Sequence, residues 1–148
     1  KKYFLFLFFL YCVFALKTNA QTDTAFWFVA PEVWAGHSDS PIYLRFASFD
    51  SPATVSITQP ANAGFPEQTV SLNANDAQSI NLTNWLNIIE NKPVNQILNY
   101  GIYISSTVPI TAYYEEASIN NPDLLSLKGN NALGTEFYTP FQNLLNSY

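Results

Sequence analysis

The sequence predicts an all-β fold, an antiparallel β-sandwich or irregular barrel of Ig-like character with one short helix. After residue 24, apolar residues recur mostly at every second position, which is the period of a strand with one buried face. Turn-forming residues interrupt these runs about every ten positions. Helical spacing is confined to one short stretch. Short strands at this spacing, with almost no helix, are typical of sandwiches and barrels.

The first third of the chain predicts three short strands. A short apolar run at residues 26–29 ends at Pro31. Residues 42–47 and 55–57 then alternate between apolar and polar side chains, and Ser-Pro at 51–52 separates them. Proline and serine favour turns, so this pattern predicts two strands joined by a short turn.

The middle of the chain predicts two more strands and the helix. A loop rich in Pro, Asn and Gly covers residues 60–66. Residues 69–72 and 80–82 resume the alternation on either side of a polar turn at 73–76. At 84–91 the apolar spacing changes to three and four residues, which predicts one short helix.

The last third predicts a second hairpin and a terminal strand. Residues 102–105 and 110–114 alternate around a Thr-Val-Pro turn at 107–109. A short apolar stretch follows at 124–127, and a final strand is predicted at 137–138.

Residues 1–20 have the layout of a secretory signal peptide. Two lysines precede an apolar run at 3–16, and the small residues Thr18 and Ala20 are placed for cleavage. A transmembrane anchor is the alternative reading, but the run falls short of the ~20 residues that cross a bilayer. We therefore expect a cleaved leader and, at 21–148, a single β-rich module that forms the N-terminal part of a larger protein, secreted or held at the cell surface.

Cleavage changes the composition of the chain. It removes three of the six basic residues and the only cysteine, Cys12, and leaves all eleven acidic residues, so the formal charge becomes −8. Such a chain repels phosphate backbones, which argues against nucleic-acid binding. It also has no disulfide, zinc-thiolate centre or cysteine nucleophile. We expect no cofactor and no membrane span after cleavage.

The only histidine, His37, stands between Gly36 and Ser38-Asp39. A nucleophilic triad needs groups that converge from different elements beside an oxyanion hole, and adjacent residues rarely build one. We therefore interpret the segment as a polar turn that can contribute to a binding loop. We do not expect an enzyme.

No calcium-loop motif is present and we predict no metal site, although Asp23, Asp39 and Glu136 could still meet in space. Glu115 and Glu116 follow each other on a predicted strand, so they should point to opposite faces rather than act as a pair.

Aromatic residues make up 16% of the chain. Core filling and cross-strand pairing explain most strand aromatics, and a platform for sugars or a partner protein is the alternative. The residues with which we expect the module to bind are Trp34, His37, Asp39, Tyr103 and Tyr113. Tyr103 and Tyr113 are the first pair to consider as a platform.

Four segments carry a resemblance to a known family: FWFVAPE at 26–32, PIYLR at 41–45, PITAYYE at 109–115 and NALGTEFYTP at 131–140. Together they resemble the N-terminal IgGFc-binding-protein-like module of large exported bacterial surface proteins, over most of residues 23–143. The resemblance implies a β-rich module followed by Ig-like domains, adhesion repeats and a C-terminal sorting domain. It transfers no site residue.

We therefore expect a non-enzymatic, exported cell-surface module with an adhesion or scaffold role that binds an extracellular protein or glycan, beside further domains of its own chain. One alternative is a carbohydrate-binding accessory module or a fragment of a glycan-processing enzyme. Convergence of Asp39, Glu115 and Glu136 in a cleft would favour the enzyme. The other alternative is a purely structural spacer.

Overall fold

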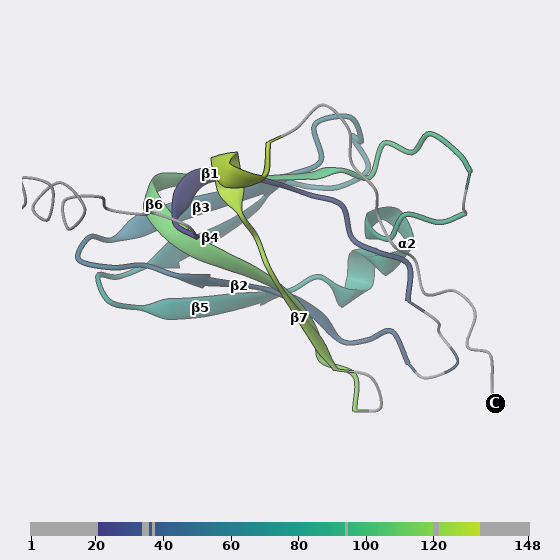
Figure 1. Ribbon diagram of the computed structural model, residues 1–148, viewed down its shortest axis with the longest axis horizontal. Helices are drawn as coiled ribbons and strands as arrows, with labels where there is room; N and C mark the ends of the chain where they lie inside the picture. The colour runs from purple at the N-terminus through teal and green to yellow at the C-terminus, as the bar shows by residue number, and fades with distance from the viewer. Residues whose placement is uncertain (1–20, 34–35, 37, 94, 120–121, 134–148) are drawn as a thin grey trace, which may run out of the picture.

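A computed structural model describes residues 21–33, 36, 38–93, 95–119 and 122–133 (Figure 1). These residues form an antiparallel, nearly closed, barrel-like sheet with one short α-helix, which confirms the predicted fold class. The strands are β1 (Asp23–Phe28), β2 (Ile42–Ala47), β3 (Ala53–Thr58), β4 (Gln68–Leu72), β5 (Ala77–Asn81), β6 (Ile102–Glu116) and β7 (Asp123–Ser126). The helical elements are η2 (Thr83–Trp85), α2 (Leu86–Ile89) and η3 (Gly129–Ala132). No helix among the described residues is both long enough and apolar enough to cross a membrane.

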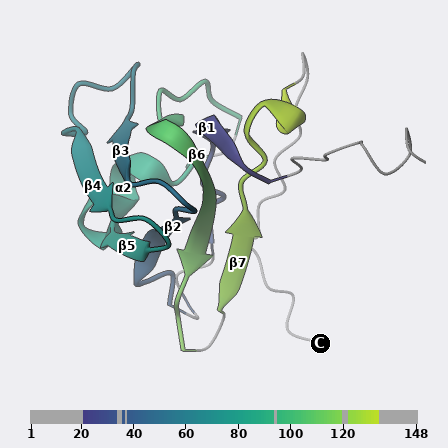
Figure 2. The ribbon, with the colours of Figure 1, turned by 90° about the vertical axis from the view of Figure 1, so that its left-hand side faces the viewer.

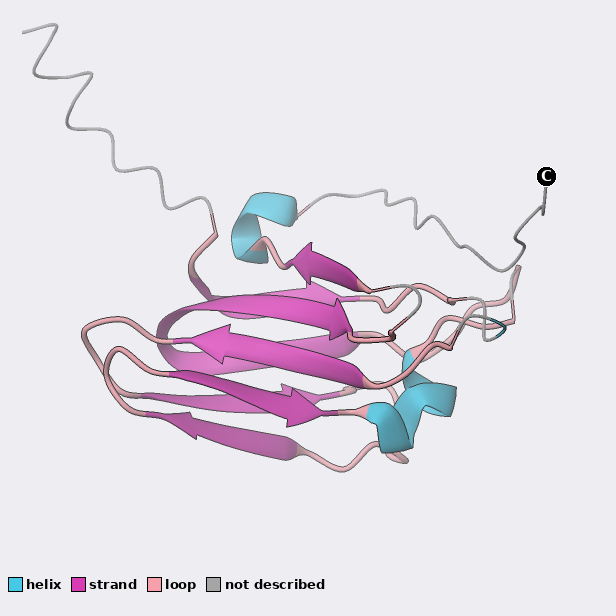
Figure 3. Ribbon diagram, turned by 90° about the horizontal axis from the view of Figure 1, so that it is seen from below, coloured by secondary structure: helices cyan, strands magenta, loops and turns pink. Residues whose placement is uncertain are grey.

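The 15-residue strand β6 joins the two halves of the barrel. Its first half pairs with β1 and β3, and β4 continues this sheet beyond β3. Its second half pairs with β2 and β7, and β5 continues beyond β2. In Figure 2 β7 lies beside β6, and Figure 3 shows the strands wrapping around into a nearly closed sheet. We call these the β1–β4 sheet and the β7–β5 sheet.

The prediction that residues 102–105 and 110–114 pair as a hairpin is therefore wrong. Both segments are strand, but residues 107–109 between them are strand as well and belong to the continuous strand β6, whose two halves pair with different partners in different sheets. Ser51 and Pro52 lie in a short connection between two strands, as predicted. Those strands, β2 and β3, belong to different sheets and do not pair with each other. The predicted helix is present in shortened form, as η2 and α2. The predicted strand at 137–138 lies outside the described residues.

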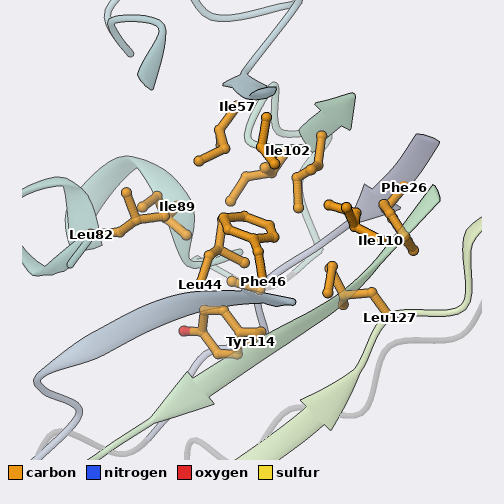
Figure 4. Close-up of a cluster of buried hydrophobic side chains, with 14 of the residues drawn as sticks. Phe26, Leu44, Phe46, Ile57, Leu82, Ile89, Ile102, Ile110, Tyr114 and Leu127 are labelled. Carbon is orange, nitrogen blue, oxygen red and sulfur yellow. The ribbon is translucent and has the colours of Figure 1, made fainter. Parts of the chain in front are cut away.

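The two-residue alternation builds the core. On β2, Ile42, Leu44 and Phe46 are buried, and Tyr43 and Arg45 between them face outward. The buried side chains from both sheets meet in one cluster, shown in Figure 4. Its aromatic and aliphatic members include Phe26, Leu44, Phe46, Ile57, Leu82, Ile89, Ile102, Ile104, Ile110 and Leu127. Burial of this apolar surface supplies the main driving force for folding.

The start of β1 is tied to η3 by polar contacts. The Asp23 carboxylate accepts hydrogen bonds from the backbone N–H of Asn130 at 2.7 Å and from its side-chain amide at 3.1 Å. Gly129 precedes this contact with a φ of 57°, and a Cβ there would lie 2.5 Å from Cβ of Asp23. Only glycine fits, because both the backbone conformation and the space exclude a side chain.

Replacing Gly129 with alanine should therefore cost about 1–2 kcal/mol of unfolding free energy, since the left-handed conformation strains an L side chain and the added methyl group pushes β1 away. The measurement is urea unfolding. Gly101 is the matched control, because a Cβ there meets nothing within 4 Å. Gly101→Ala should change stability by less than about 0.5 kcal/mol. Equal effects at the two positions would contradict the role assigned to Gly129.

Candidate functional site

The five residues predicted to bind do not form one site in the described part of the chain. Trp34 and His37 lie outside the described residues. Asp39 lies in the loop before β2, while Tyr103 and Tyr113 lie on opposite halves of β6. Tyr103 belongs to the β1–β4 sheet and Tyr113 to the β7–β5 sheet, so they do not share one platform.

Tyr103 instead lies against Trp27, its register partner on β1. The ring centroids are 4.6 Å apart and the planes are tilted by 36°, within the range of favourable aromatic pairs. Phe26 is buried and Phe28 is partly buried, so the alternation directs Trp27 outward, where 60% of it is exposed. A Trp ring that remains this exposed beside a second ring offers a broad apolar contact surface.

Hydroxyl side chains surround this pair on the outer surface of the β1–β4 sheet. Thr58 is the register partner of Tyr103 on β3, and Ser56 is the partner of both Ser105 and Thr69. The strand segments that build this surface contain no Lys, Arg or Glu. Glu67 lies just before β4, at the margin, and accepts a hydrogen bond from Ser56. We call this surface, with Trp27, Tyr103, Thr58, Ser56, Ser105 and Thr69, the aromatic face.

The outer surface of the β7–β5 sheet has a different character. Tyr113 lies opposite Arg45 and Ser126 in the register. Arg45 forms an ion pair with Glu115, and its guanidinium carbon lies 5.4 Å from the Tyr43 ring centroid. Arg45 on this surface is thus already paired with Glu115 and with the Tyr43 ring.

A set of buried charged and polar side chains lies at the α2 end of the barrel (right in Figure 1). Glu90 follows α2 and is fully buried, and its Oε2 accepts a hydrogen bond from Lys92 Nζ at 2.6 Å. Its other carboxylate oxygen has no hydrogen-bond partner among the described residues. Burial of a carboxylate is costly, and the Lys92 ammonium offsets part of that cost.

Tyr114 and Glu116 enter the same region from β6. Both are buried, and the Tyr114 hydroxyl and Glu116 Oε1 also have no partner among the described residues. Glu116 faces inward while Glu115 faces outward to Arg45, which confirms that the two carboxylates point to opposite faces. We call Asp39, Glu90, Lys92, Tyr114 and Glu116 the acid cluster.

Burial and mutual repulsion shift the pKa values in the acid cluster. Burial raises the pKa of Glu116 to about 7, and the negative charges of Glu90, Asp39 and Asp123 add to the rise. Burial also raises the pKa of Glu90, against the opposing effect of Lys92. The pKa of Tyr114 rises for the same reasons, burial first and then the charges of Glu90 and Glu116. Partial burial lowers the pKa of Lys92, but its hydrogen bond and charge interaction with Glu90 raise it by more.

Only part of the carboxylate set that would favour an enzyme, Asp39, Glu115 and Glu136, lies within the described residues. Asp39 interacts electrostatically with Glu116, but Glu115 is on the outer surface, and Glu136 lies outside the described residues. Across the described ranges, no three or more His, Cys, Asp or Glu side chains are grouped so that they could hold a metal ion.

Sequence reasoning missed Trp27, Glu90, Lys92 and Glu116. The alternation of the sequence could have identified two of them. Ile110, Ala112 and Tyr114 point inward on β6, and the same alternation continues to Glu116. On β1 the alternation places Trp27 on the outer face. Glu90 and Lys92 follow a short helix, where charged residues are usually solvated, so nothing local marks their burial.

No family model matches the chain, and no curated protein matches it. A solved structure described as the crystal structure of Thermotoga maritima 1070 is similar over 80% of this chain and 100% of that chain, at 17% identity and a TM-score of 0.45.

Proposed function

We propose that the chain is a non-enzymatic, exported module that contributes to a cell-surface adhesin or scaffold and binds through the aromatic face. The observation that carries the proposal is the exposed Trp27 side chain packed beside Tyr103 on the outer surface of the β1–β4 sheet. Large exposed aromatics are enriched where proteins bind partners. The leader sequence supports export, and the resemblance to the IgGFc-binding-protein-like module supports a place at the head of a surface protein.

The composition of the aromatic face favours an uncharged glycan over a charged partner. Serine and threonine hydroxyls can both donate and accept hydrogen bonds, as sugar hydroxyls require. The aromatic rings supply apolar area for the C–H faces of a sugar ring. Lys and Arg, which would attract acidic ligands, are missing from the strand segments that build the aromatic face. This favours the carbohydrate-binding form of the module over a spacer without a ligand.

Trp27→Ala should weaken binding to neutral glycans by about 10- to 100-fold, because truncation of a central aromatic anchor typically costs about 2 kcal/mol or more. The stability of the fold should change little, since Trp27 is mostly exposed. The measurement is binding of the chain without its leader to an array of neutral and acidic glycans, followed by titration of the best neutral glycan.

Tyr113→Ala is the matched control, because it removes an aromatic residue from the other sheet. It should leave glycan binding unchanged. Loss of binding in Tyr113→Ala but not in Trp27→Ala would place the contact on the other surface. Binding to extracellular protein alone would change the ligand class, and no binding of either kind would favour the structural spacer.

A further inference from the structure

Glu116 lies in surroundings that do not suit a charged carboxylate. Its register partners are Ile42 on β2 and Asp123 on β7, so one neighbour is apolar and the other carries the same charge. Like charges directly opposite one another in an antiparallel pair are destabilising. The carboxyl is buried and its Oε1 has no partner among the described residues.

The other charged groups that face Glu116 add little compensation. They are Asp39 from the loop before β2, Glu90 from the segment after α2, and Asp123 from β7, all acidic. The single ammonium nearby, Lys92, is bound to Glu90 Oε2. On β6 itself, the Tyr114 hydroxyl is buried and unpartnered within the described ranges, and Glu115 is paired with Arg45 on the opposite face.

Short backbone contacts hold the chain closed around this cluster. The N–H of Ala117, next to Glu116, donates to the Pro41 carbonyl oxygen at 2.8 Å. The N–H of Asn91, next to Glu90, donates to the Ala30 carbonyl oxygen at 3.1 Å. These two contacts tie the end of β6 and the segment after α2 to opposite ends of the connection between β1 and β2.

We propose that the acid cluster is a pH-operated latch, in which Glu116 keeps the α2 end of the barrel closed when it is protonated and loosens that end when it ionises. A neutral carboxyl can remain between Ile42 and Asp123 without an uncompensated charge. In the proposed latch, an ionised carboxyl gains solvation when the contact between Ala117 and Pro41 opens. The opening would be confined to the contact between Ala117 and Pro41 while the two sheets remain folded.

The direction of the pH effect follows from the raised pKa of Glu116. Below pH 4.5, its ordinary value, the carboxyl is protonated in both the closed and the open form, and closure is fully favoured. As pH rises from 4.5 to about 7 the open form loses its proton first, so closure weakens. Above about 7 both forms are ionised and the effect levels off.

Amide hydrogen exchange between pH 4.5 and 8.5, corrected for intrinsic exchange rates, tests the latch. The protection of the Ala117 N–H should fall on the order of a hundredfold and then level off, because a rise in the pKa of Glu116 from 4.5 to about 7 changes an opening equilibrium by about that factor. Amides in the ladder between β3 and β6 should keep their protection. Equal loss throughout the chain would indicate a change in global stability and overturn the latch.

Glu116→Gln should abolish this pH dependence and keep Ala117 protected, since the amide has the same shape and no titration. Glu115→Gln is the control, one residue away and outward, and should keep the wild-type profile. A pH dependence that persists in Glu116→Gln would assign it to another group and overturn the proposal.

Discussion

Lys92→Ala is expected to lower the free energy of unfolding by about 3 kcal/mol at pH 7.5, because it leaves the fully buried Glu90 carboxylate without its only side-chain partner among the described residues. The cost should shrink as pH falls toward 4.5. Burial already raises the pKa of Glu90, so the carboxyl can become neutral by binding a proton. Urea unfolding at several pH values measures both effects.

Two further variants separate this loss from other causes. Lys92→Ala combined with Glu90→Gln should recover most of the stability, since the stranded charge is gone. Arg45→Ala breaks the partly exposed ion pair with Glu115 and should cost less than about 1 kcal/mol. If Lys92→Ala costs no more than Arg45→Ala, or if the double variant recovers nothing, then the buried pair does not have the role assigned to it.

Phe46→Ala is expected to cost about 3–5 kcal/mol, the range for removing a buried aromatic side chain and leaving a cavity. Phe46 is 1% exposed and lies on β2, which is paired on both sides by β5 and β6. Figure 4 shows its ring within the cluster beside Leu44. A domain of this size is stable by about 5–15 kcal/mol, so the variant should be close to unfolding at room temperature.

Phe49→Ala provides the comparison, because Phe49 follows β2 and is 47% exposed. It should change stability by less than about 1 kcal/mol in the same urea titration. Similar costs at both positions would mean that the inward alternation of β2 does not define the core as described.

The positions of the strands could be predicted because they depend on local rules. The alternation at 42–47 and 69–72 appears as β2 and β4, and the change of spacing near residue 84 appears as η2 and α2. Pleated backbone places successive side chains on opposite faces, so a period of two in the sequence already separates inner from outer residues.

The pairing of the strands could not be predicted in the same way. The Thr-Val-Pro segment at 107–109 predicts a turn that folds residues 110–114 back onto 102–105, but in the structure it is strand and continues β6 from one sheet into the other. A short Pro-containing segment between two alternating segments is compatible with a hairpin and with one strand that crosses between sheets. The choice depends on strands distant in sequence, β1 and β3 on one side and β2 and β7 on the other.

The sequence by itself determined the all-β class, the inward and outward sets of residues and the acidity of the chain, because each follows from composition or from a period of two. Only the tertiary structure decided that Trp27 meets Tyr103, and that Glu90 and Lys92 share a buried region with Glu116. The register of β1 and β6 places Trp27 opposite Tyr103, and the fold of the segment after α2 brings Glu90 and Lys92 near the end of β6. Register depends on how all the apolar faces pack at once, which no local pattern encodes.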